Sequence, residues 1–85
     1  MAYRVTWSST AENELAELWL AAQTRSRVTE SAKRLEQGMI QQPLTLGESR
    51  EGNRRIVFDD FLACDFIVDE RMRHVHVFSI WKHCE

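Results

Sequence analysis

The chain has 85 residues, of which 44% are hydrophobic, so it can bury one core but is too short to divide into two. Its formal net charge of -2 excludes a long-range basic field, so any contact with RNA must be local. The sequence has no long apolar run, no secretory-signal pattern and only two cysteines. We therefore expect a single domain over residues 1–85, with reduced thiols, in the cytoplasm and not in a membrane.

The first predicted element is a strand over residues 3–7, where large and polar side chains alternate. Ser9 and Glu12 then match a capping box, the pattern that begins an α-helix. Apolar residues at helical spacing extend this helix over about residues 10–23. Trp19 belongs to that apolar stripe, so we predict that it lies in the core.

A short polar stretch over residues 23–26 precedes a second predicted helix. Val28, Leu35 and Met39 recur there at helical spacing until Pro43, which forbids continuation. A connection of a few residues favours an antiparallel helix pair. The joint apolar face of the two helices needs a sheet to cover it.

Three β-rich stretches follow, over residues 54–58, 61–68 and 72–81. Short acidic turn signals separate them, so we expect antiparallel neighbours. The opening strand must join the same sheet, since a lone strand cannot satisfy its backbone groups. The element order is β-α-α-β-β-β, and we predict an α+β fold with a helical hairpin packed on a four-stranded, mainly antiparallel sheet.

The last strand is apolar on both of its predicted faces. Strict alternation places Val77 and Trp81 on one face and Phe78 and Ile80 on the other. One face should pack on the helices, which leaves an apolar strip exposed on the other. Exposed strips of this kind commonly mark a protein partner, here a helix or strand laid along the sheet.

Three arginines gather where a loop containing Gly47 enters the second predicted strand. Arg50, Arg54 and Arg55 are permanently charged planar groups suited to phosphate or carboxylate. The cluster indicates a site for an anion, either RNA backbone or an acidic partner segment. Alternatively, the arginines pair with nearby carboxylates of the chain itself. Alternation in a strand sends Arg54 and Arg55 to opposite faces.

With these elements in this order, the chain resembles the RelE/ParE superfamily of toxins from type II toxin–antitoxin modules. The resemblance covers nearly the whole length and rests on the element order, the small size and four sequence features. These are the opening segment 3–15, Pro43 before the loop, Arg54-Arg55 entering the second strand, and Trp81-Lys82-His83 at the end of the last strand. The loop Gly47-Glu48-Ser49-Arg50 resembles a subgroup labelled plasmid-stabilisation proteins.

The resemblance implies one of two activities on a single fold. RelE-like members cleave messenger RNA in the ribosomal A site, whereas ParE-like members bind DNA gyrase and need no nuclease residues. Both are neutralised by an antitoxin whose disordered tail folds over the toxin. We expect a toxin that inhibits growth by ribosome-associated mRNA cleavage without a cofactor. The alternatives are a gyrase-binding toxin and an inactive member that only binds its antitoxin.

Metal-free RNA cleavage needs groups that deprotonate the 2′-hydroxyl, stabilise the phosphorane and protonate the leaving oxygen. The resemblance implies Arg55 and Lys82 for charge stabilisation. It implies His83 as the general acid or base, because histidine exchanges protons near neutral pH. Arg50 and Arg54 would then hold phosphate, although Arg50 is better placed to brace the loop. Alternatively, Lys82 and His83 form a solvated tail.

Other candidate groups carry less chemistry. The only tyrosine in the sequence, Tyr3, lies in the opening strand, which counts against efficient RelE-type cleavage. His74 and His76 share a face of the last strand and could supply two metal ligands, but a third is missing nearby. We therefore predict no metal site, and we predict that Cys64 is a small buried core residue.

Overall fold

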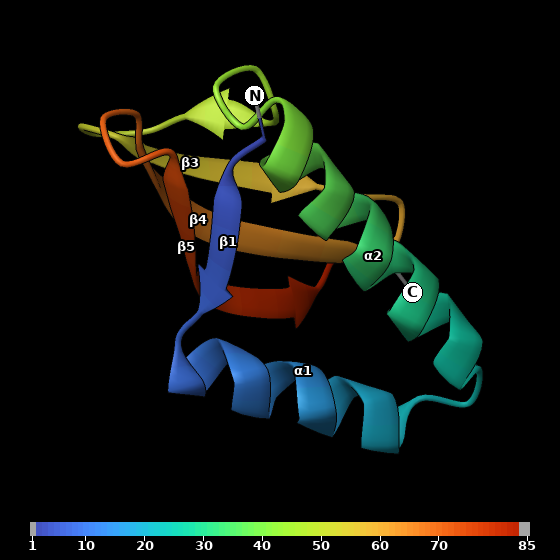
Figure 1. Cartoon of the computed structure of the whole chain (residues 1–85). Coiled ribbons are helices and arrows are strands. Elements are labelled where there is room, and N and C mark those ends of the chain that lie inside the picture. Colours follow the sequence, from blue (N-terminus) through green and yellow to red (C-terminus); the bar gives the residue numbers. More distant parts are fainter. Residues whose placement is uncertain (1, 84–85) are drawn as a thin grey trace.

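A computed structural model describes residues 2–83 as two helices and one five-stranded sheet (Figure 1). The elements are β1 (Arg4–Trp7), α1 (Ser9–Ala21), α2 (Arg25–Gln41), β2 (Glu48–Ser49), β3 (Arg54–Phe58), β4 (Leu62–Asp69) and β5 (His74–Lys82). The strand order is β1-β5-β4-β3-β2; β1 runs parallel to β5, and the other pairs are antiparallel. This confirms the predicted α+β architecture. The predicted number of strands was wrong, because the two-residue β2 adds a fifth.

The helix ends follow from local chemistry. Helix α1 begins at Ser9, one residue earlier than predicted, because Ser8 and not Ser9 is the N-cap. The Ser8 hydroxyl oxygen accepts a hydrogen bond from the backbone N–H of Ala11 at 3.0 Å. Helix α2 ends at Gln41, just before Pro43, as predicted. Neither helix is long and apolar enough to cross a membrane.

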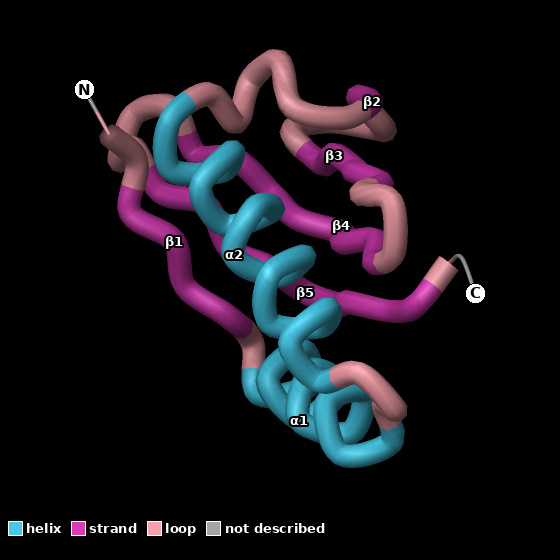
Figure 2. The backbone as a smooth tube through the Cα atoms, turned by 90° about the vertical axis from the view of Figure 1, so that its right-hand side faces the viewer, coloured by secondary structure: helices cyan, strands magenta, loops and turns pink. Residues whose placement is uncertain are grey.

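The two helices cover different parts of the sheet (Figures 1 and 2). Helix α2 crosses one face, here called the covered face, whereas α1 lies along the half of β5 that extends beyond β1. The core lies between α2 and the covered face, and its largest fully buried side chains include Phe66, Met39, Leu62 and Ile80. Among residues 2–83, no helix covers the opposite face.

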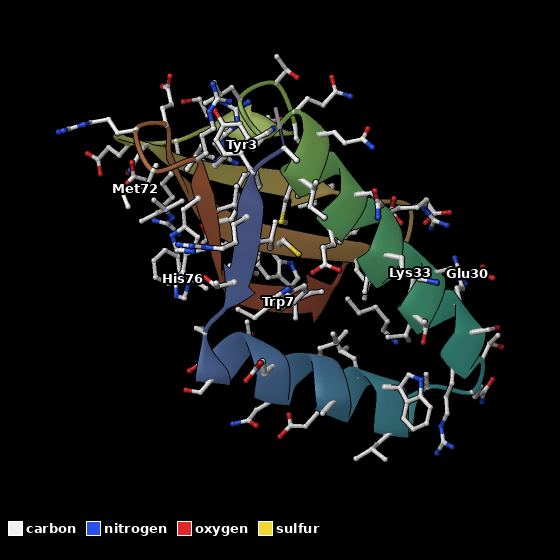
Figure 3. All side chains as sticks on the ribbon, viewed as in Figure 1. Tyr3, Trp7, Glu30, Lys33, Met72 and His76 are labelled. Carbon is white, nitrogen blue, oxygen red and sulfur yellow. The ribbon has the colours of Figure 1, made fainter. Side chains whose placement is uncertain are left out.

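That opposite face, here called the open face, follows from strand register and alternation. Its residues include Arg4, Thr6, Arg54, Ile56, Phe58, Asp65, Ile67, Asp69, His74, His76, Phe78 and Trp81. Figure 3 shows His76 and Trp7 on opposite sides of β1, in agreement with this division. The same rule confirms that Arg54 and Arg55 point to opposite faces.

A bulge in β5 decides which apolar residues of this strand are exposed. Asp65 pairs with Ser79 and Phe66 pairs with Val77, so Phe78 has no partner in the ladder. One extra residue reverses the alternation beyond it. Val77 and Ile80 are therefore both buried, while Phe78 is 39% exposed. The predicted face assignment, which required strict alternation, was wrong at this point.

Helix α1 closes the edge of β5 that β1 leaves unpaired. The Glu14 carboxylate oxygen Oε1 accepts hydrogen bonds from the backbone N–H of Ile80 at 3.0 Å and from the Ser79 hydroxyl at 2.9 Å. Unpaired edge amides are templates for association with other strands. This carboxylate therefore covers a backbone donor that no neighbouring strand reaches.

Candidate functional site

Arg55 holds the loop that precedes β3. Its guanidinium donates from Nε to the carbonyl oxygen of Leu46 at 2.9 Å and from Nη2 to that of Gly47 at 3.1 Å. Gly47 has φ of +71°, and a Cβ at this position would overlap the carbonyl oxygen of Ile56. Arg55 and Gly47 together fold the loop tightly against β3 and so create β2.

The other two arginines of the predicted cluster bind carboxylates. On the open face, Arg54 donates from Nε and Nη2 to the two carboxylate oxygens of Asp65, at 2.9 and 2.6 Å. This bidentate hydrogen bonding raises the pKa of the Arg54 guanidinium, which is half exposed. Arg50 forms an exposed ion pair with Glu48 at 3.0 Å, so it braces the loop.

Lys82 and His83 lie at the far end of the sheet from Arg55. Lys82 pairs with Leu62 and Arg55 pairs with Phe66, so they are separated by four residues of β4, about 13 Å along the strand. Lys82 projects on the side of the covered face and forms no ion pair with any described residue.

His83 packs against the open face. Its ring meets that of Phe58 edge-on, with centroids 5.2 Å apart, and its Nε2 is within hydrogen-bond reach of the backbone carbonyl oxygen of Asp59. The structure thus places His83 and Arg54 on the open-face side. It does not gather Arg55, Lys82 and His83 into one cluster.

An ionic cluster ties α2 to the turn between β3 and β4. The Arg34 guanidinium donates to the carboxylates of Asp59 at 2.7 Å and Asp60 at 2.9 Å. The buried Ser31 hydroxyl also donates to Asp59. Hydrogen bonding from Arg34 above all lowers the pKa of Asp59 to about 2. The acidic turn therefore pairs with a helix residue rather than with Arg54 or Arg55.

Thr6, His74 and His76 lie together on the open face, and the sequence did not predict that Thr6 is a neighbour of the two histidines. The Thr6 hydroxyl oxygen is 2.7 Å from Nε2 of His74 and 2.8 Å from Nδ1 of His76. Both histidines face the same way, as predicted, and the parallel pairing of β1 with β5 brings Thr6 between them. Across residues 2–83, no three His, Cys, Asp or Glu side chains gather around a possible metal position.

Cys64 is a free thiol in the core, as predicted from its apolar surroundings. Burial, more than the nearby carboxylates, raises the pKa of this thiol to about 12. A thiol that stays protonated is a poor nucleophile, so Cys64 belongs to the packing. The second cysteine, Cys84, lies outside the described residues.

An apolar groove of about 700 Å³ runs between α1 and α2. Its lining includes Trp7, Leu15, Trp19, Leu20, Val28 and Ala32. Trp19 is 40% exposed and carries the Arg25 guanidinium 4.5 Å from its ring centroid, so the prediction that it lies in the core was wrong. Leu35 of α2 is buried, as its place in the apolar stripe of that helix predicted.

The fold matches several solved structures over nearly the whole chain. The toxin–antitoxin complex RelBE2 from Mycobacterium tuberculosis gives a TM-score of 0.80 at 15% identity, covering 98% of this chain and 100% of that chain. The chromosomal ParDE TA system from P. aeruginosa gives 0.70 at 12% identity, covering 98% and 97%. The isolated E. coli RelE toxin gives 0.65 at 16% identity, covering 99% and 86%.

No protein-family model matches the sequence, and no curated protein matches it significantly. The structural matches nevertheless confirm the architecture that the sequence resemblance implied. The chain has the RelE/ParE fold.

Proposed function

We propose that this protein is the toxin of a type II toxin–antitoxin module and that it inhibits growth by cleaving messenger RNA on the ribosome. The toxin role draws support from the similar structures, which are named as RelE, RelBE2 and ParDE proteins. Those names include both RelE and ParE, so the choice of target has to come from the surface of this chain.

The observation that supports RNA as the target is the set of side chains on the open face. Phe58 is 48% exposed and Phe78 is 39% exposed, and the same face carries the half-exposed guanidinium of Arg54. Aromatic rings on a sheet stack on unpaired bases, and guanidinium groups bind phosphate. Aromatic and cationic side chains on one helix-free face are therefore suited to a single RNA strand.

The sequence-predicted residues take different roles in this proposal. Arg54 contacts phosphate and is held in place by Asp65, while His83 contacts RNA near Phe58. Arg55 is a positioning residue that fixes the loop before β3. Lys82 faces the other side of the sheet and has no role in this RNA contact.

The acidic balance of the chain also shapes the proposal. With a net charge of -2, the protein gains little counterion-release energy from RNA in solution. The ribosome would therefore position the substrate, and the open face would engage only a few nucleotides.

Induction in a bacterial host tests the proposal. We expect growth arrest with defined breaks in cellular transcripts, mapped by primer extension. An Arg54→Ala, Phe78→Ala double variant should lose the breaks, and Lys33→Ala on α2 should retain them. Growth arrest with intact transcripts would contradict RNA cleavage.

The antitoxin partner is tested separately. A small acidic or DNA-binding protein encoded directly beside this chain should suppress toxicity and co-purify with it. The Arg54→Ala, Phe78→Ala double variant should still bind that protein, which would separate loss of toxicity from loss of the complex. Failure of the neighbouring product to bind would count against the module.

A second candidate function is inhibition of DNA gyrase by binding. The groove between α1 and α2 favours it, because exposed Trp19 and Leu20 offer apolar contacts to a protein. This candidate predicts DNA-damage signalling with intact messenger RNA after induction. A Trp19→Ala, Leu20→Ala double variant should then lose toxicity while the open-face double variant keeps it.

A further inference from the structure

A hydrogen-bonded chain on the open face has no role in the contacts described so far. It consists of the Thr6 hydroxyl and the two imidazoles that lie 2.7 and 2.8 Å from its oxygen. We propose that His74 and His76 are the general base and general acid of RNA cleavage, and that Thr6 passes a proton between them. This inference rests on the proposed function and names the acid–base groups of that site.

The hydrogen-bonding capacity of a hydroxyl group constrains the two rings. With its single proton, Thr6 can donate to one ring nitrogen only, and it must accept from the other. In the neutral pair, the ring that donates to Thr6 keeps a free lone pair on its second nitrogen. The ring that accepts from Thr6 carries an N–H on its second nitrogen. His74 and His76 are thereby held in complementary forms, one a base and one a donor.

Burial alone does not require this arrangement. Thr6, His74 and His76 are all partly exposed, so water could satisfy each of them separately. The ring centroids lie 6.1 Å apart, a separation that lets both imidazoles approach oxygens of one phosphodiester. The geometry fits a pair that acts on a shared substrate group.

The surroundings provide a phosphate-binding group and a stacking surface. Arg54 pairs with Ile67 and Ile67 with His76, so Arg54 lies two strand spacings from His76, about 10 Å away on the same face. The ring of Phe78 meets that of His76 edge-on, with centroids 5.1 Å apart. An RNA strand on Phe78 would place a phosphate between the guanidinium and the imidazoles.

Charged groups of both signs face the two histidines. From β1, Arg4 pairs with His74; from β4, Asp69 pairs with His74 while also accepting the backbone N–H of Met72 at 3.1 Å. On the β3 and β4 side, Arg54 and Asp65 form an ion pair whose guanidinium stays half exposed. Helix α2 lies on the opposite face of the sheet.

The proposed step balances in protons and bonds. The 2′-hydroxyl gives its proton to the imidazole with the free lone pair, and its oxygen attacks phosphorus. The bond from phosphorus to the 5′-oxygen breaks, which leaves a 2′,3′-cyclic phosphate. The first imidazole passes its inner proton to Thr6, and Thr6 passes its own proton to the second imidazole. The outer N–H of that second ring protonates the 5′-oxygen.

Single-turnover cleavage of a defined messenger RNA on purified ribosomes tests the assignment. We expect His74→Gln and His76→Gln each to lower the cleavage rate by about 10²–10⁴-fold, the usual contribution of a positioned acid or base. Thr6→Val should also lower the rate, whereas Thr6→Ser, which keeps the hydroxyl, should restore most of it. Thr10→Val, an exposed site on α1, is the matched control and should cleave normally.

The pH dependence distinguishes a proton relay from a merely structural hydroxyl. A relay works from the neutral pair, so the wild-type rate should fall only towards acid pH. Without the relay, one ring must start protonated and the other neutral, so Thr6→Val should show a bell-shaped profile. Circular dichroism and ribosome binding of each variant verify that the fold and the complex persist.

The outcomes separate the two proposals. Absence of cleavage by the wild-type protein overturns both RNA cleavage and the acid–base assignment. Normal cleavage by both histidine variants overturns the assignment and leaves RNA cleavage in place. A Thr6→Val protein with the wild-type rate and the wild-type pH profile overturns the relay, even where a histidine variant fails to fold.

Discussion

The covered and open faces of the sheet are built from the same strands, but their side chains have different surroundings. On the covered face, Phe66 is fully buried, whereas on the open face Phe78 is 39% exposed and its ring meets that of His76 edge-on. The adjacent residues Arg54 and Arg55 also differ, because Arg54 is bound to the carboxylate of Asp65 on the open face and Arg55 to loop carbonyls. One face packs into the core of the fold, and the other is left uncovered by the helices.

The sharpest test of this contrast replaces one phenylalanine from each face. Phe66→Ala should destabilise the fold by about 3–5 kcal/mol, because it leaves a cavity in the core. Phe78→Ala should cost below about 1 kcal/mol and should weaken RNA cleavage instead. Urea unfolding measures both. Equal losses of stability would show that the open face is part of the core.

The loop before β3 depends on Gly47. Gly47→Ala should destabilise by about 2–3 kcal/mol, since it combines a positive φ with a clash against the Ile56 carbonyl. Gly52 also has a positive φ, of +65°, but a Cβ there meets open space. Gly52→Ala should therefore be milder, and thermal unfolding of both variants provides the comparison. A Gly47→Ala protein as stable as Gly52→Ala would contradict the close approach.

Removal of each neighbouring arginine should separate structure from function. Arg55→Ala should cost about 1–2 kcal/mol, because two loop carbonyls lose their partner. Arg54→Ala should change stability less, since the guanidinium that it removes is half exposed to solvent. We expect Arg54→Ala to have the larger effect on RNA cleavage. If Arg54→Ala were the more destabilising variant and Arg55→Ala the more damaging to RNA cleavage, the structural and RNA-binding roles of the two arginines would be exchanged.

The smallest expected effect concerns acid stability at the turn between β3 and β4. The folded-state pKa of Asp59 is about 2, below the ordinary value of 3.8, so the unfolded chain binds this proton first. The stabilisation is complete above about pH 4 and is lost as the pH falls through about 2. Asp59→Asn should unfold with a weaker pH dependence in this window. If the urea midpoints of the wild-type protein and Asp59→Asn changed identically with pH, Asp59 would not be the cause of the loss of stability in acid.

Much of the fold could be predicted because it depends on local patterns. Helical spacing located α2, and the position of Pro43 gave its end. β-Rich and apolar stretches separated by acidic turns located β3, β4 and β5. Four features were missed because they depend on distant contacts or on details one residue wide. They are β2, the bulge at Phe78, the Ser8 cap and the exposure of Trp19.

The site was less predictable for the same physical reason. Residue types indicated Arg54, Arg55 and the C-terminal basic residues, but alternation alone cannot say which partners neutralise a guanidinium. Thr6 and His74 are 68 positions apart in the chain, and only the register of β1 on β5 brings them together. A parallel pairing between the first and last strands would have been the signal needed to find this cluster.

The carboxylate of Glu14 bears on the tendency of the protein to self-associate. Because α1 occupies the rim of β5, detachment of that helix would uncover an unsatisfied amide at Ile80 together with the apolar side chains beneath it. Detachment of α1 would then also expose an edge through which a second copy of the chain can associate. Helix α1 thus protects the edge of β5 from association with other chains, in addition to its part in the packing of the domain.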